Sequence, residues 1–139
     1  MAETWRGIYP ITSFVLEALG RKRNAGGEGV FSPEERTLLK AVEFWAAAAH
    51  GTLLEHLRPN VRENLTEARR AFAALGAVRV VSLLRVAIEE LADGPMRQSE
   101  TAVIEQLDDR LARTDDNIED LIARYAGAIE NPAESAAAQ

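Results

Sequence analysis

The stretch from residue 99 to residue 128 reads SETAVIEQLDDRLARTDDNIEDLIARYAGA. Large apolar residues recur in it at steps of three and four, with Thr114 and Ala128 at the remaining positions: Ile104, Leu107, Leu111, Ile118, Leu121 and Tyr125. This heptad pattern predicts a long helix whose narrow apolar seam packs against another helix, either of the same chain or of a second copy.

The seam has one weak point. Thr114-Asp115-Asp116-Asn117 is typical of a helix N-cap followed by an acidic first turn, so two helices meeting at Arg113 are the alternative. Because the heptad register passes through these residues unchanged, we expect one continuous helix.

The composition is that of a helical domain. The chain has 139 residues, of which 47% are hydrophobic and only 6% aromatic, enough for one core but not for two domains. Its formal net charge of -6 disfavours nonspecific binding to nucleic acid or anionic membranes, although a local basic patch could still bind either. The absence of cysteine excludes disulfides and thiolate sites.

Helical spacing of apolar residues continues through the rest of the chain. It predicts helices over 10–21, 32–57, 60–75 and 77–92, besides the helix over 99–128. The segment 77–92 is the least polar, so we expect it to be the central helix, with a strand over 78–81 as the local alternative. The result is an all-α, single-domain bundle of four to five helices over residues 1–130. We further expect an N-terminal arm over 1–9, a mobile loop over 21–30 and a disordered tail over 131–139.

Three helix starts carry capping signals. Ser32-Pro33-Glu34-Glu35 places Ser at the N-cap, Pro at the first helical position and Glu at the third. Asn60 and Ser99 are the expected caps of the helices that follow them.

Chemical motifs are scarce. The histidines, His50 and His56, are six residues apart on one predicted helix and would face different directions, so they cannot bind one metal together. No nucleophile elbow, P-loop or dinucleotide-binding fingerprint occurs. We therefore name no catalytic, cofactor-binding or metal-binding residues and expect no cofactor; an enzymatic or cofactor-binding bundle using His50 is the second alternative function.

The basic residues are the best candidates for binding a polyanion. The candidates are Arg21, Lys22, Arg23, Arg69 and Arg70, with Arg79 and Arg85 further along. No recognition helix, zinc finger or aromatic stacking platform accompanies them. A helical subunit contacting nucleic acid through these residues is the first alternative function.

Protein contact is the role that the sequence favours. Trp5 and Tyr9 lie in the N-terminal arm, which either folds over its own core or reaches a partner subunit. Together with the six seam residues, they form the expected interface. We predict a non-enzymatic scaffold, adaptor or accessory subunit that self-associates and binds a further protein. Because no targeting segment or membrane span is evident, we expect it in the cytoplasm, with no membrane partner.

Overall fold

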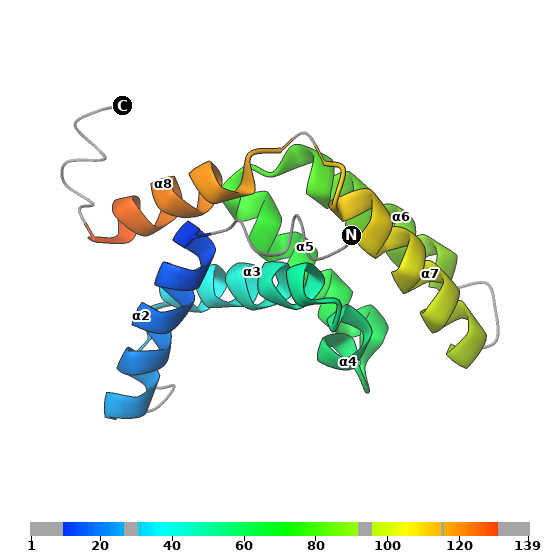
Figure 1. Cartoon of the computed structure of the whole chain (residues 1–139), viewed down its shortest axis with the longest axis horizontal. Coiled ribbons are helices and arrows are strands. Elements are labelled where there is room, and N and C mark those ends of the chain that lie inside the picture. Colours follow the sequence, from blue (N-terminus) through cyan, green and yellow to red (C-terminus); the bar gives the residue numbers. More distant parts are fainter. Residues whose placement is uncertain (1–9, 27–30, 92–95, 115, 131–139) are drawn as a thin grey trace.

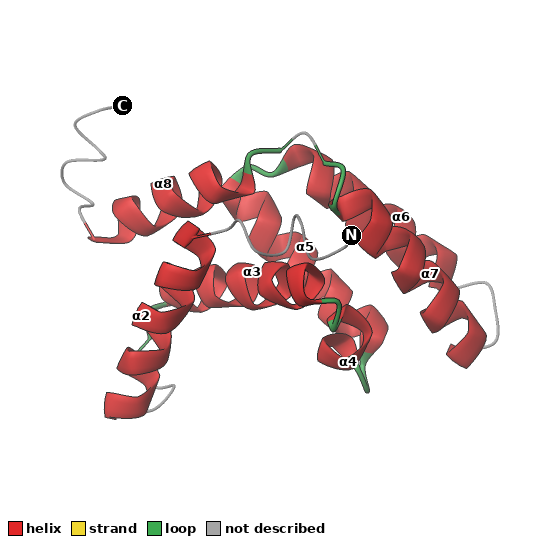
Figure 2. Cartoon of the chain, viewed as in Figure 1, coloured by secondary structure: helices red, strands yellow, loops and turns green. Residues whose placement is uncertain are grey.

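The computed structural model describes residues 10–26, 31–91, 96–114 and 116–130. Every element in these residues is a helix, and no strand occurs among them (Figure 2). The helices are α2 (Pro10–Gly26), α3 (Pro33–His50), α4 (Leu53–Leu57), α5 (Val61–Leu75), α6 (Val78–Leu91), α7 (Met96–Leu111) and α8 (Ile118–Glu130). The all-α prediction is confirmed, including helix instead of strand over 78–81.

The described part of the chain has seven helices where four to five were expected. One reason is Gly51, whose left-handed conformation (φ 76°) ends α3, while its N–H donates to the carbonyls of Ala47 and Ala48. The predicted helix over 32–57 is therefore divided into α3 and α4.

The second reason is that the long C-terminal helix does not exist. α7 ends at Leu111 and α8 begins at Ile118, so the two-helix alternative is correct. The oxygen Oδ1 of Asn117 accepts a bond from the N–H of Asp120 at 3.1 Å, which caps α8. The chain is thus interrupted where the sequence signal indicated, but the cap is Asn117 and not Thr114, and Asp116 precedes the helix.

Only one of the three predicted caps is confirmed. Ser32 and Glu35 form a reciprocal capping box at α3. Asn60 holds the N-cap position of α5, but its side chain makes no capping hydrogen bond. Ser99 lies inside α7, which begins at Met96.

The loop prediction over 21–30 is also wrong for its first part. α2 continues to Gly26, while residues 27–30 are outside the described part of the chain. The segments 1–9 and 131–139, predicted to be an arm and a tail, are outside it as well.

The central helix is α3, not α6. α3 packs against α2, α4, α5 and α8 (Figure 1). Its alanines let neighbouring helices approach closely, and Phe44 and Trp45 pack edge-on against Phe72 of α5 with ring centroids 5.5 and 6.4 Å apart. α6 packs against α5 and forms a hairpin with α7 at one side of the molecule (Figure 1), and its Val78 is 72% exposed.

One ion pair joins this α6–α7 hairpin to α4. Nε of Arg58, at the C-terminal end of α4, lies 3.3 Å from Oε2 of Glu100 on α7. Glu100 is the one charged residue that is buried in the described part of the chain. The pair therefore adds a polar contact between the N-terminal half of α7 and the end of α4.

Candidate functional site

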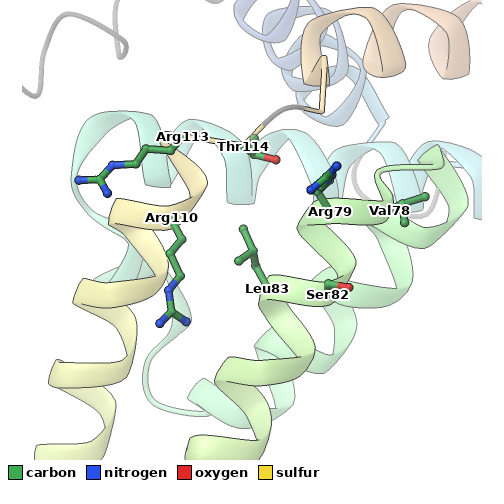
Figure 3. A pocket seen from close by; sticks show the side chains of 7 residues that line it. All are labelled: Val78, Arg79, Ser82, Leu83, Arg110, Arg113 and Thr114. Carbon is green, nitrogen blue, oxygen red and sulfur yellow. The ribbon is translucent and has the colours of Figure 1, made fainter.

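A groove between α6 and α7 is the best candidate site. Its volume is about 650 Å³, and it lies where the start of α6 meets the end of α7 (Figure 3). Its lining residues are Val78, Arg79, Ser82, Leu83, Arg110, Arg113 and Thr114. We call this feature the arginine groove.

Helical spacing explains how α6 contributes to the groove. Val80, Leu84, Ala87 and Leu91 form the buried stripe of the helix. Residues one position before that stripe, Arg79 and Leu83, are four apart and share the face beside α7, while Val78 and Ser82 form the outer edge. An apolar floor thus adjoins a charged side chain on one helix.

The C-terminal end of α7 supplies the other wall. Arg110 lies in its last turn, and Arg113 and Thr114 follow the helix. In Figure 3, Arg79 and Arg110 come from opposite walls of the groove with Leu83 between the two helices, whereas Arg113 extends from the end of α7 away from α6. They do not converge on one point.

The arginines of the groove are poorly neutralised. Arg113 pairs with Asp109 at 3.2 Å, but the two side chains are 76% and 59% exposed, so the pair is weak. Arg79 and Arg110 form no hydrogen bond or ion pair within the described residues. Two of the three arginines of the groove therefore have no carboxylate partner among the described residues, although the chain as a whole has a net charge of -6.

The first turn of α6 is already occupied by an acidic side chain. Oδ2 of Asp116, in the linker between α7 and α8, accepts a hydrogen bond from the backbone N–H of Val80 at 2.9 Å. The linker therefore closes the helix N-terminus, and the guanidinium groups remain as the main positive groups of the groove.

The structure does not gather the predicted polyanion residues into one patch. Nζ of Lys22 lies 2.7 Å from Oε2 of Glu35, and Arg23 lies over the ring of Phe31 and 3.9 Å from Glu43. These cations of α2 thus bind carboxylates of α3. Arg69 and Arg70 lie elsewhere, on α5.

The predicted seam lies mostly in the core of the single chain. Ile104, Leu107, Leu111 and Ile118 are each no more than 3% exposed, so they cannot form an exposed interface. Leu121 and Tyr125 of α8 are half-buried and pack on the same core. Trp5 and Tyr9 belong to the segment that the structure does not describe.

The two histidines have separate environments. His50 is the exposed last residue of α3. His56 of α4 lines a small cavity of about 140 Å³ with Lys40, Glu43, Phe44, Asn64 and Ala68. Burial lowers the pKa of His56, and this effect exceeds the opposing attraction of Glu43. The described residues hold no group of three or more potential metal ligands.

Sequence reasoning missed Arg110 and Arg113 as partners of Arg79. A usable signal was present. Arg79 and Arg110 lie at nearly equal distances along the sequence from Asp93-Gly94-Pro95, so an antiparallel pair of helices joined there brings them together. The expectation that a helix over 99–128 packs on a second copy left no place for an antiparallel pairing of α6 with α7.

Comparison with protein-family models, curated proteins and solved structures finds no match to this chain. Among the described helices, none has the length and apolar character required to cross a membrane.

Proposed function

We propose that this chain is a non-enzymatic helical adaptor or accessory subunit that binds a protein partner through the arginine groove. One observation carries the proposal: Val78, which is 72% exposed, lines the same groove as Arg79 and Arg110, and these two arginines have no carboxylate partner among the described residues. Arginine is enriched in protein interfaces and among their hot spots, and covering an exposed apolar side chain removes its surface from water.

The alternative functions have less support. Lys22 and Arg23, two of the five proposed nucleic-acid contacts, pair with Glu35 and Glu43 on α3, while Arg69 and Arg70 lie on α5, so the five do not form one basic patch. No described contact gives His50 a role in catalysis or cofactor binding, so we do not propose one.

The proposal keeps a cytoplasmic location and self-association as its expectations. Self-association would need a surface other than the buried seam. Leu121 and Tyr125 of α8 are only partly covered and could still contribute to it. The molar mass of the purified chain at micromolar concentration measures this directly.

Photo-crosslinking in the native source tests the adaptor role. We would place p-benzoylphenylalanine at position 78 of α6 and, as the control, at exposed position 74 of α5. The expected result is a discrete protein adduct from position 78 that survives nuclease treatment and is absent from position 74. Equal adducts at both positions, or adducts that nuclease removes, would contradict the proposal.

A further inference from the structure

We infer that the partner segment bound by the arginine groove is acidic and amphipathic, with carboxylates on Arg79 and Arg110 and apolar side chains on Leu83 and on Val78 at the outer edge (Figure 3). This inference rests on the proposed adaptor function and adds the chemistry of the partner to it.

Charge is the first argument. A guanidinium group binds a carboxylate through two parallel hydrogen bonds, and such charge-assisted pairs are the strong ones. Arg79 and Arg110 have no such partner in the described residues, while Arg113 can exchange its exposed pairing with Asp109 at little cost. The groove can therefore accept more than one carboxylate without breaking a buried interaction.

The spread of the arginines favours a segment over a single small anion. The guanidinium groups of Arg79 and Arg110 come from opposite walls of the groove, Arg113 extends away from α6, and the three do not surround one point (Figure 3). A lone phosphate would therefore contact only part of the set. The other anion-binding device nearby, the start of α6, has its Val80 N–H occupied by Asp116.

The apolar floor favours protein over nucleic acid. Leu83, between the two helices, and Val78, on the outer edge of the groove, each offer aliphatic surface, and no aromatic ring on which a base could stack is among the described residues that line the groove (Figure 3). The net charge of -6 repels every anionic ligand, so an acidic segment that adds apolar contacts to its ion pairs is favoured over a polyanion that offers charge alone.

Fluorescence anisotropy with defined probes tests this inference. The first probe is a short labelled peptide of alternating Glu and Leu. In the second peptide, Ser replaces every Leu, and the third probe is a single-stranded DNA oligonucleotide of equal charge. We expect saturable binding of the Glu–Leu peptide that weakens as salt is added, with clearly weaker binding of the other two.

Variants with equal charge assign the binding to the groove. The double substitution Arg79→Gln and Arg110→Gln should raise the Kd of the Glu–Leu peptide about tenfold or more. The control is the double variant Arg70→Gln with Arg85→Gln, which removes the same charge from exposed positions outside the groove. It should change the Kd of the Glu–Leu peptide about twofold at most. Val78→Ser should raise the Kd of the Glu–Leu peptide but leave the Kd of the Glu–Ser peptide unchanged. Because these positions are exposed, the variants should keep the wild-type circular dichroism spectrum.

Several results would overturn the inference. These are equal losses in the two double variants, equal affinity for the Glu–Ser and Glu–Leu peptides, tighter binding of the oligonucleotide, and no peptide binding at about 1 mM. A nuclease-resistant protein adduct at position 78 together with no peptide binding would reject the acidic partner and leave the adaptor role standing. Peptide binding without any such adduct would reject the adaptor role and leave the groove's preference for an acidic, amphipathic peptide standing.

Discussion

Glu35 has two structural roles at the start of α3. Its Oε1 accepts the backbone N–H of Ser32 at 2.9 Å, completing the capping box, and its carboxylate also binds Nζ of Lys22 on α2. The hydrogen bond from Lys22 is the main reason that the pKa of Glu35 lies below its ordinary value of 4.5. One carboxylate thus holds α2 against α3.

The lowered pKa of Glu35 predicts a pH-dependent stability. A carboxyl group with a depressed pKa stabilises the fold fully above 4.5, and this contribution disappears as pH falls through the lowered pKa. Glu35→Gln should reduce the free energy of unfolding at neutral pH by about 0.5 kcal/mol, since Lys22 is 43% exposed and solvent screens the pair.

Urea denaturation at pH 7 and at about pH 3 checks this prediction. Glu34→Gln is the matched control, because it removes a charge from the same helical turn without breaking the Lys22 pair. The gap between wild type and Glu35→Gln should close at low pH. A gap that persists there, or that Glu34→Gln reproduces, would refute the role of the pair.

At the scale of elements, the linker between α7 and α8 controls two helix starts. Asn117 caps α8, and Asp116 accepts the N–H of Val80 in the first turn of α6. A side chain far along the sequence thus does for α6 what a local N-cap does elsewhere.

Asp116→Ala should therefore reduce stability by about 1 kcal/mol, the usual effect of losing a cap. Asp116→Asn keeps an acceptor oxygen and should lose less. Asp109→Ala, at a 59% exposed side chain, should change the free energy of unfolding by under about 0.5 kcal/mol. Thermal unfolding followed by circular dichroism measures all three, and equal effects of Asp116→Ala and Asp109→Ala would rule out this cap.

Local signals predicted much of the helical structure. Ser32-Pro33-Glu35 acts through neighbouring backbone groups, so the sequence alone located the start of α3, and the predicted helix over 60–75 ends where α5 ends, before the left-handed Gly76. Long-range contacts could not be found this way. The Asp116–Val80 hydrogen bond and the Lys22–Glu35 pair depend on how distant helices pack, and so does the arginine groove.

The heptad seam also shows that a sequence pattern does not identify the packing partner. Periodicity shows which residues face a neighbour but not which neighbour they face. Leu107 and Leu111 of α7 and Ile118 of α8 keep the predicted register, yet they bury it inside their own chain. The same pattern therefore fits a private core as well as a shared seam.

Leu111→Ala distinguishes these two locations. Leu111 is 1% exposed, so truncating it should reduce the free energy of unfolding by about 2–5 kcal/mol and leave the molar mass of the native species unchanged. Leu121→Ala, at a half-buried position of α8, is the milder comparison. Denaturant titration and light scattering give the two quantities. A smaller species formed without a loss of monomer stability would restore the shared seam.

For the whole molecule, one core connects all the larger helices. Its buried members run from Val15 and Leu19 of α2 to Ile118 and Ile122 of α8. The α6–α7 hairpin lies at one side of the molecule in Figure 1, but Val80 and Leu84 belong to the same core, and the Arg58–Glu100 pair ties α7 to α4. We therefore expect the α6–α7 hairpin to unfold together with α2, α3, α4, α5 and α8.

Two spectroscopic probes test this cooperativity. With Trp5→Phe as the background, Trp45 reports on the centre, where it is 1% exposed beside Phe72, while far-ultraviolet circular dichroism reports on all helices. The two denaturant transitions should coincide. Val80→Ala, a core substitution in the hairpin, should lower both midpoints equally, with a loss of about 0.5–3 kcal/mol. If the hairpin unfolded separately, the dichroism signal would fall first and Val80→Ala would leave the Trp45 midpoint in place, because α3 would then remain packed on α2, α5 and α8 without it.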